Sequence, residues 1–189
     1  MKRSILALFF CLSPLFSLHA QNFIEGWKSV DSLLSNQYYT QAYDMSDKLY
    51  QQALRQHDTR NSLIAAYYLS LTGEAFKEDN STSSLERYQL LLPQLYDVDK
   101  ALCHMLLASF YADYYLNNSW RIRQNRATDE SDLDYKLWDA DRYRAVVEEH
   151  VRLAFSDKDA LKNTRSESLG RLVTLDHYGN DGDLTPTLF

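Results

Sequence analysis

The side chains of this sequence that are most able to do chemistry are its histidines and cysteines. After residue 20, histidines occupy positions 57, 104, 150 and 177, and no two are four residues apart. That spacing would place a zinc-binding pair on one face of a helix. Cys103 and His104 are adjacent, so on a helix they point about 100° apart and cannot form a nucleophile–base pair with each other. We therefore interpret Cys103 as a buried thiol, and we predict no catalytic residue, no metal site and no cofactor.

Two acidic patterns give weaker indications of chemistry. Glu148 and Glu149 precede His150 on an expected amphipathic helix, which predicts that both acids face water. A helical hydrolase that uses His150 with Glu149 is an alternative, but no nucleophile or metal set accompanies the pair. The segment Asp176–Asp183 is similar to a calcium loop, yet aligning the two puts His177 at a ligand position, where it does not fit. A glycine-rich turn explains this segment better.

The first 20 residues have the layout of a secretory signal peptide. Lys2 and Arg3 precede an apolar run from Ile5 to Leu18, and Ala20 is followed by polar residues. The run contains Pro14 and is shorter than the ~20 apolar residues of a spanning helix. We expect cleavage after Ala20, export to the periplasm, the outer membrane or the outside of the cell, and no integral membrane segment afterwards.

The charge and cysteine content of the mature chain exclude some functions. Removing residues 1–20 deletes two of the 20 cations and none of the 26 acids, which moves the formal net charge from −6 to −8. So acidic a chain offers no attraction to phosphate backbones, and we predict that it does not bind nucleic acid. Cys103 alone remains, so an intrachain disulfide cannot form.

The spacing of apolar residues predicts an all-α fold. They recur three and four positions apart, and the chain has five glycines and three prolines. We expect residues 21–189 to form one domain of about seven helices, stacked as hairpins like a tetratricopeptide or HEAT-like solenoid. LIAAYYLS at 63–70 and FYADYYLN at 110–117 would be its faint repeat. Chance similarity of two tyrosine-rich helices explains them equally well.

Capping residues and breakers place the expected helices along the chain. They are a stripe from Ile24 to Leu34, a helix from about Tyr38 to Gln56, one capped by Asp58 or Asn61, one opened by the capping box Ser83–Glu86 and ended at Pro93, one starting at Asp97 or Asp99, one capped by Asp139 and closed at Asp157–Asp159, and a short one around Leu169–Val173. The run Ala101–Ala112 is apolar nearly all round, which predicts a central helix. Its expected core residues are Leu102, Met105, Leu106 and Phe110.

An acidic loop at 125–134 lies between two tryptophans and is accompanied by arginines. Aromatic and arginine side chains are enriched in recognition surfaces. The candidate partner surface comprises Trp120, Arg121, Arg126, Trp138 and Arg142. A structural corner, in which Trp138 packs the loop back onto the helices, is the favoured alternative, because large aromatics in such domains more often pack than bind.

The last third of the chain contains an ordered set of residues that carries a family resemblance. They are Tyr111, Tyr114–Tyr115, Asn118, Ile122, Arg126, Thr128, Trp138–Asp139 and Thr185–Leu188. In this order they resemble the N-terminal helical region of bacterial alpha-2-macroglobulin-like proteins, large secreted chains of a protease-trapping class. The thioester motif often found in that family, Cys-x-Glu-Gln, is absent, because Cys103 precedes His-Met-Leu.

The resemblance implies a non-catalytic scaffold or docking segment of a secreted endopeptidase inhibitor. Its protein partners would be downstream macroglobulin domains, a protease or a component of the cell envelope. We expect the chain to be truncated at its C-terminal end and to self-associate through Leu188 and Phe189. The alternative is a free-standing secreted adaptor, similar to tetratricopeptide proteins, that binds a protein or peptide.

Cleavage of the signal peptide is directly testable. Intact-mass measurement of the exported protein should show a chain that begins at Gln21, because Ala20 ends the expected cleavage site. Retention of residues 1–20 in a membrane fraction would contradict the prediction. So would a diacylglyceryl adduct on Cys11, which we do not expect because the bulky Phe10 precedes it.

Overall fold

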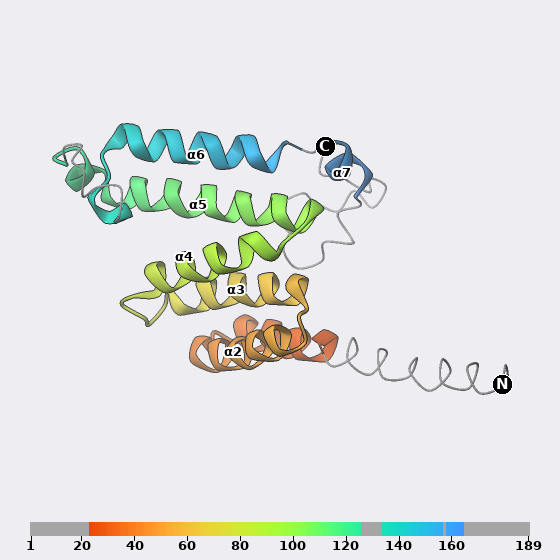
Figure 1. Cartoon of the computed structure of the whole chain (residues 1–189). Coiled ribbons are helices and arrows are strands. Elements are labelled where there is room, and N and C mark those ends of the chain that lie inside the picture. The colour runs from red at the N-terminus through yellow and green to blue at the C-terminus, as the bar shows by residue number, and fades with distance from the viewer. Residues whose placement is uncertain (1–22, 126–133, 157, 165–189) are drawn as a thin grey trace, which may run out of the picture. The chain divides into compact units, whose positions relative to one another are not determined.

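The chain is all-α in the computed structural model, which describes residues 23–125, 134–156 and 158–164. These residues form seven α-helices and two short 3-10 helices, with no strand (Figure 1). After a first helix at residues 23–35, the elements are α2 (Tyr39–Arg55), α3 (Thr59–Gly73), α4 (Asn80–Leu91), η1 (Leu92–Gln94), α5 (Asp97–Ile122), η3 (Tyr135–Leu137), α6 (Ala140–Ala154) and α7 (Lys158–Asn163). The predicted fold class is confirmed at this level.

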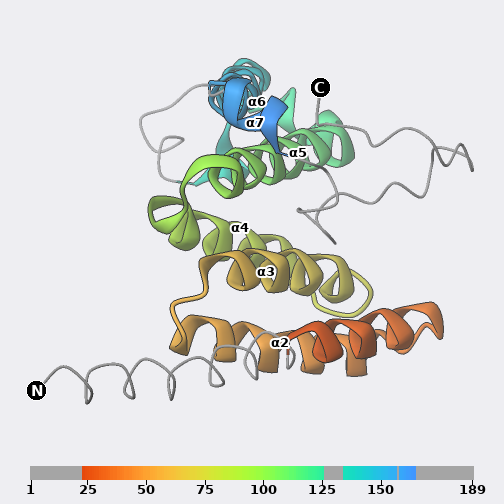
Figure 2. The ribbon, with the colours of Figure 1, turned by 90° about the vertical axis from the view of Figure 1, so that its right-hand side faces the viewer.

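The helices pack as sequential pairs within two compact units, Met1–Asn80 and Ser81–Phe189. In the first unit α2 lies along α3, and in the second α5 lies along α6, as both views show (Figures 1 and 2). The two similar octapeptides occupy different places, because 63–70 belongs to the second helix of its pair and 110–117 to the first. Chance similarity therefore describes them better than an internal repeat does.

Polar side chains fix the first unit at its helix ends. Asp58 caps α3 as expected, since its carboxylate accepts the backbone N–H of Asn61 at 3.0 Å. The indole N–H of Trp27 donates to the side chain of Asn61 at 2.9 Å, and the Trp27 ring stacks on Tyr68. The Tyr68 hydroxyl donates to Asp31 at 2.8 Å. These bonds tie the first helix to α3.

The turn between α2 and α3 uses a residue that the sequence does not mark. His57 has a φ of 54° just after the helix end, a place where glycine is the usual residue. The backbone N–H of Asp58 then reaches back to the carbonyl of Ala53 at 3.0 Å. The sequence has no glycine at this turn, so only the helix-capping residue Asp58 predicts where the turn lies.

The second unit is organised by the long helix α5 and its partner α6. Asp139 caps α6 as predicted, because its side chain accepts the N–H of Arg142 at 2.8 Å. Asn118 leaves helical geometry within α5 and donates its side-chain amide to the Tyr114 carbonyl at 2.9 Å. Helix α7 packs against α5 through Leu161.

The expected core of α5 is partly wrong. Met105 is 41% exposed, and Leu102, Leu106 and Phe110 are half-buried. The buried positions are instead Ala101, Cys103, His104, Leu107, Ala108 and Tyr111. Small side chains occupy several of these positions, and they let neighbouring helices approach closely. A helix that is apolar on every side does not reveal from its sequence which of its faces will be buried against a neighbouring helix.

The start of α4 also differs from the prediction. The helix begins at Asn80, ahead of the expected capping box at Ser83–Glu86. The buried Asn80 side chain donates to the carbonyl of Ser70 at 2.7 Å. This bond holds the backbone at Asn80, three residues before the expected capping box. Pro93 lies in η1 directly after the end of α4, as expected.

Several predictions fall outside the described residues. They are the signal peptide at 1–20, most of the acidic loop at 125–134, the short helix at Leu169–Val173 and the tail that ends at Phe189. Helix α7 occupies a segment read from the sequence as the end of the preceding helix. None of the helices that the structure describes is long and apolar enough to cross a membrane.

Truncation of Leu107 should test the corrected core. Leu107→Ala should lower the free energy of unfolding by about 2–5 kcal/mol, because the side chain is 1% exposed and its removal leaves a cavity. Met105→Ala is the matched control on the same helix and should cost well under half as much. Urea unfolding followed by circular dichroism measures both. Equal losses would show that α5 buries a different face.

Candidate functional site

A cluster of aromatic rings joins α5, η3 and α6 in the second unit. We call it the aromatic cluster, and it consists of Phe110, Tyr111, Tyr114, Tyr135, Trp138 and Tyr143. Tyr111 stacks on Trp138 with centroids 5.2 Å apart, and Tyr114 meets Tyr135 edge to face at 4.9 Å. Trp138 meets Tyr143 edge to face at 5.4 Å. These are the separations at which aromatic pairs attract one another.

Hydrogen bonds lock the backbone of η3 to this cluster. The Tyr143 hydroxyl donates to the carbonyl of Tyr135 at 2.5 Å, and its ring is 1% exposed. Burial raises the pKa of the Tyr143 hydroxyl well above its usual value of 10.0, so it stays a donor across the physiological range. The side-chain amide of Asn125 donates to the Trp138 carbonyl at 2.9 Å. Asn125, at the end of α5, is therefore joined to the residues that lead into α6.

The candidate partner surface divides into exposed and buried members. Trp120 is 69% exposed, and Arg121 donates to the Tyr114 hydroxyl at 2.6 Å. Trp138 is only 8% exposed and stacks on Tyr111, so its ring does not present a face for binding. The guanidinium of Arg142 lies over the Trp138 ring at 5.4 Å, and Arg126 lies outside the described residues.

Beside the aromatic cluster, α5 and α6 bring two histidines together. The Nδ1 atoms of His104 and His150 are 2.9 Å apart, and the His150 ring stacks on Tyr111 with centroids 5.8 Å apart. The spacing of the histidines in the sequence does not predict this pair. The two residues are 46 positions apart, so no local spacing could reveal them. Only the register of α6 against α5 places them in contact.

The surroundings of the two imidazoles favour their neutral forms. Burial lowers the pKa of His104, and the nearby His150 and Lys100 lower it further. Burial also lowers the pKa of His150. Glu149 opposes both shifts, but its exposed carboxylate accepts two hydrogen bonds from Arg152, at 2.7 and 2.6 Å. Glu149 therefore does not orient the His150 imidazole, whose Nδ1 faces His104 instead.

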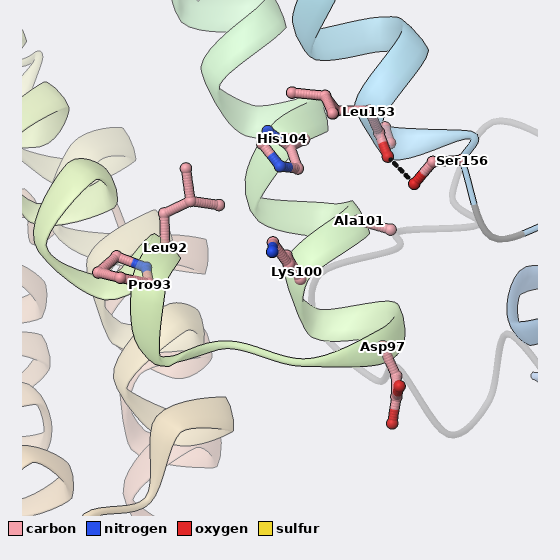
Figure 3. A pocket seen from close by; sticks show the side chains of 9 residues that line it. Leu92, Pro93, Asp97, Lys100, Ala101, His104, Leu153 and Ser156 are labelled. Carbon is pink, nitrogen blue, oxygen red and sulfur yellow. Dashed lines mark hydrogen bonds between the residues drawn. The ribbon is translucent and has the colours of Figure 1, made fainter.

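A pocket of about 550 Å³ opens next to His104 (Figure 3). Its lining residues are Leu92, Pro93, Asp97, Lys100, Ala101, His104, Leu153, Ala154 and Ser156. In the close-up, His104 and Lys100 project into the space that Leu92 and Leu153 border, while Asp97 points away. The pocket brings solvent close to an imidazole that is otherwise buried.

Cys103 is an inert thiol in this arrangement. It is fully buried, and its Sγ donates to the Tyr88 carbonyl at 3.6 Å. Burial raises its pKa to about 12, so almost no thiolate is present at neutral pH. In the part of the chain that the structure describes, no three histidine, cysteine or acidic residues lie close enough to hold a metal ion.

Comparisons with known proteins give no relative. No protein-family model, curated protein sequence or solved structure matches the chain.

Removal of one hydroxyl tests the role of the aromatic cluster. Tyr143→Phe should lower the free energy of unfolding by about 1–2 kcal/mol, because the Tyr135 carbonyl loses its donor in a buried setting. Tyr96→Phe is the control, since Tyr96 is 75% exposed, and it should have almost no effect. Urea denaturation of the two variants measures the difference. A Tyr143→Phe protein as stable as the unaltered chain would show that this bond is not needed.

Proposed function

We propose that the chain is a non-catalytic helical scaffold or docking segment of an exported protein similar to the alpha-2-macroglobulin-like endopeptidase inhibitors. The proposal includes a solenoid-like arrangement of helix pairs, export directed by residues 1–20, and protein partners rather than a small-molecule substrate. It rests on the ordered set of residues that carries the resemblance to that family.

The observation that supports the proposal most is the behaviour of those residues in the structure. Tyr111, Tyr114 and Trp138 meet in the aromatic cluster, and Asp139 caps α6. Residues scattered over the sequence therefore act together in holding one structural unit. Residues with such roles would be shared by proteins of the same helical fold, because they pack the helices and cap them rather than take part in a reaction.

The exposed end of α5 is the part of the proposed segment best suited to a protein partner. Leu116 and Trp120 are 67% and 69% exposed and lie on either side of the kink at Asn118. Arg121 adds a cation beside them. Tryptophan and arginine are the residues most enriched among strong interface contacts. We assign this end of α5 to the contact with downstream macroglobulin domains.

A free-standing adaptor is the alternative, and the consecutive pairing of helices in each unit supports it. It differs from the main proposal in the size of the native protein. In the adaptor, the helix pairs would bind a peptide or helix of another protein.

The native size of the protein separates the two proposals. An antibody raised against residues 23–164 should detect, in the exported fraction of producing cells, a protein several times larger than the 22.1 kDa chain. The reason is that a macroglobulin-like protein continues into a long series of further domains. A native product of about 20 kDa would reject the main proposal in favour of the adaptor.

Surface variants then test the docking role within the larger product. Trp120→Ala with Arg121→Ala should speed the proteolytic release of the helical segment, because the docked contact would be lost. Lys48→Ala, an exposed change on α2, is the matched control and should leave the release rate unchanged. Equal rates in all three proteins would remove the end of α5 from the proposal.

A further inference from the structure

The two imidazoles of the histidine pair face each other directly. The ring centroids are 5.2 Å apart, and the two Nδ1 atoms are 2.9 Å apart. The centroid separation is close to the sum of the Nδ1–Nδ1 distance and the distances from each Nδ1 atom to the centre of its own ring. Each Nδ1 therefore points almost straight at the other. This is the geometry of an N–H···N hydrogen bond, in which one imidazole donates and the other accepts.

The same geometry argues against a shared metal ion at this place. A zinc ion bound by both Nδ1 atoms would hold them about 3.3 Å apart, given tetrahedral geometry and zinc–nitrogen bonds of about 2.0–2.1 Å. The observed 2.9 Å leaves room for one proton only. The pair is therefore complete when both rings are neutral and a single Nδ1 carries hydrogen.

The first proton that the neutral pair gains can bind the free Nε2 of the donor ring, which leaves the Nδ1–H···Nδ1 bond intact. A second gained proton, on the acceptor ring, has no acceptable position. It would make both Nδ1 atoms donors, and two N–H groups would then oppose each other across a hydrogen-bond distance. His104 is 5% exposed, so its new charge would be poorly solvated. The pair can respond only by separating the rings, which means moving α6 away from α5.

Among the described residues, Glu149 is the anion that acts on both imidazoles, and its carboxylate is already paired with Arg152. On α5, Lys100 adds positive charge at the pocket, and Asp97 points away from His104 (Figure 3). On α6, Glu149 is bound to Arg152. η1 contributes uncharged lining residues to the pocket, and α7 packs on α5 through Leu161, with the charged Lys158, Asp159 and Lys162 exposed. Tyr111, stacked on His150, stays neutral because burial raises its pKa.

We propose that His104 and His150 form a proton-sensitive latch that holds α6 to α5 while at least one imidazole is neutral and releases the end of α6 when the pair gains a second proton and both rings are charged. The pocket beside His104 gives solvent protons access to the latch. The device acts on the α5–α6 pair itself and does not depend on the function proposed above.

The direction of the pH effect follows from the lowered pKa values of both histidines. An opened or unfolded chain binds protons at the ordinary histidine pKa of 6.5, whereas the closed pair binds them only at lower pH. The opened form therefore takes up more protons as the pH falls below 6.5. Stability from the latch is complete above that pH and decreases below it.

Hydrogen exchange on the full chain tests the latch. Between pH 7.5 and 5.5, opening of the α5–α6 amides should increase roughly tenfold per pH unit below 6.5 for each proton taken up, after correction for intrinsic exchange. The amides of α2 and α3 are the internal reference and should change far less. Carboxylates remain mostly ionised in this range, so they contribute little.

Two variants give the experiment its controls. His104→Gln combined with His150→Gln should abolish the acid-dependent opening, because neither side chain can take up a proton. His57→Asn should keep the full effect, since His57 is exposed in the first unit and its φ of 54° suits asparagine. Acid-dependent opening of the same size in the double variant would overturn the proposal.

If the double variant does not fold, the unaltered protein still decides the question. Nuclear magnetic resonance titration of its ring nitrogens should show His104 and His150 taking up protons as a coupled pair and below pH 6.5. Independent titration of His104 and His150 at the ordinary histidine pKa would also overturn the proposal.

Discussion

The position of α6 on α5 depends on the burial of Tyr143 in the aromatic cluster. This residue lies one turn into α6, is 1% exposed and bonds to the backbone of η3. A buried hydroxyl needs its partner, so the Tyr143–Tyr135 bond restricts both the depth of the ring and the course of η3. The Asp139 cap then starts α6 directly after Trp138. The register set here carries His150 to His104, two turns further along the helix.

The α5–α6 contact changes character along its length. Near the start of α6, aromatic rings with raised hydroxyl pKa values provide packing that does not respond to physiological pH. Near its end, the small Ala101 and Ala154 are buried, and the histidine pair supplies a polar joint. A buried polar pair stabilises a helix contact only while every donor has an acceptor. The two ends of the α5–α6 interface are therefore stabilised by interactions that differ in their dependence on pH.

Local signals in the sequence predicted the fold class and several helix ends. Asp58 and Asp139 act as the expected caps and Pro93 follows the end of α4, because each effect depends on residues within one turn. The exposure of Met105 was not predicted, since a uniformly apolar run does not show which face meets α6. Of the candidate surface, Trp120 is exposed and Trp138 is buried, and their identical chemistry could not separate them. The His104–His150 contact depends on tertiary register alone.

The asymmetry of the α5–α6 contact limits what the proposed latch can do. Tyr143 and His150 are seven residues apart, or about 10 Å along the helix axis. Repulsion between two imidazolium rings acts near the end of α6, whereas the stacked rings and the Tyr143 bond hold its start. Opening should therefore begin at Leu153 and Ala154, where α6 borders the pocket, and stop before the aromatic cluster. Acid would then loosen one end of a helix pair whose other end stays assembled, which makes the movement reversible without unfolding the second unit.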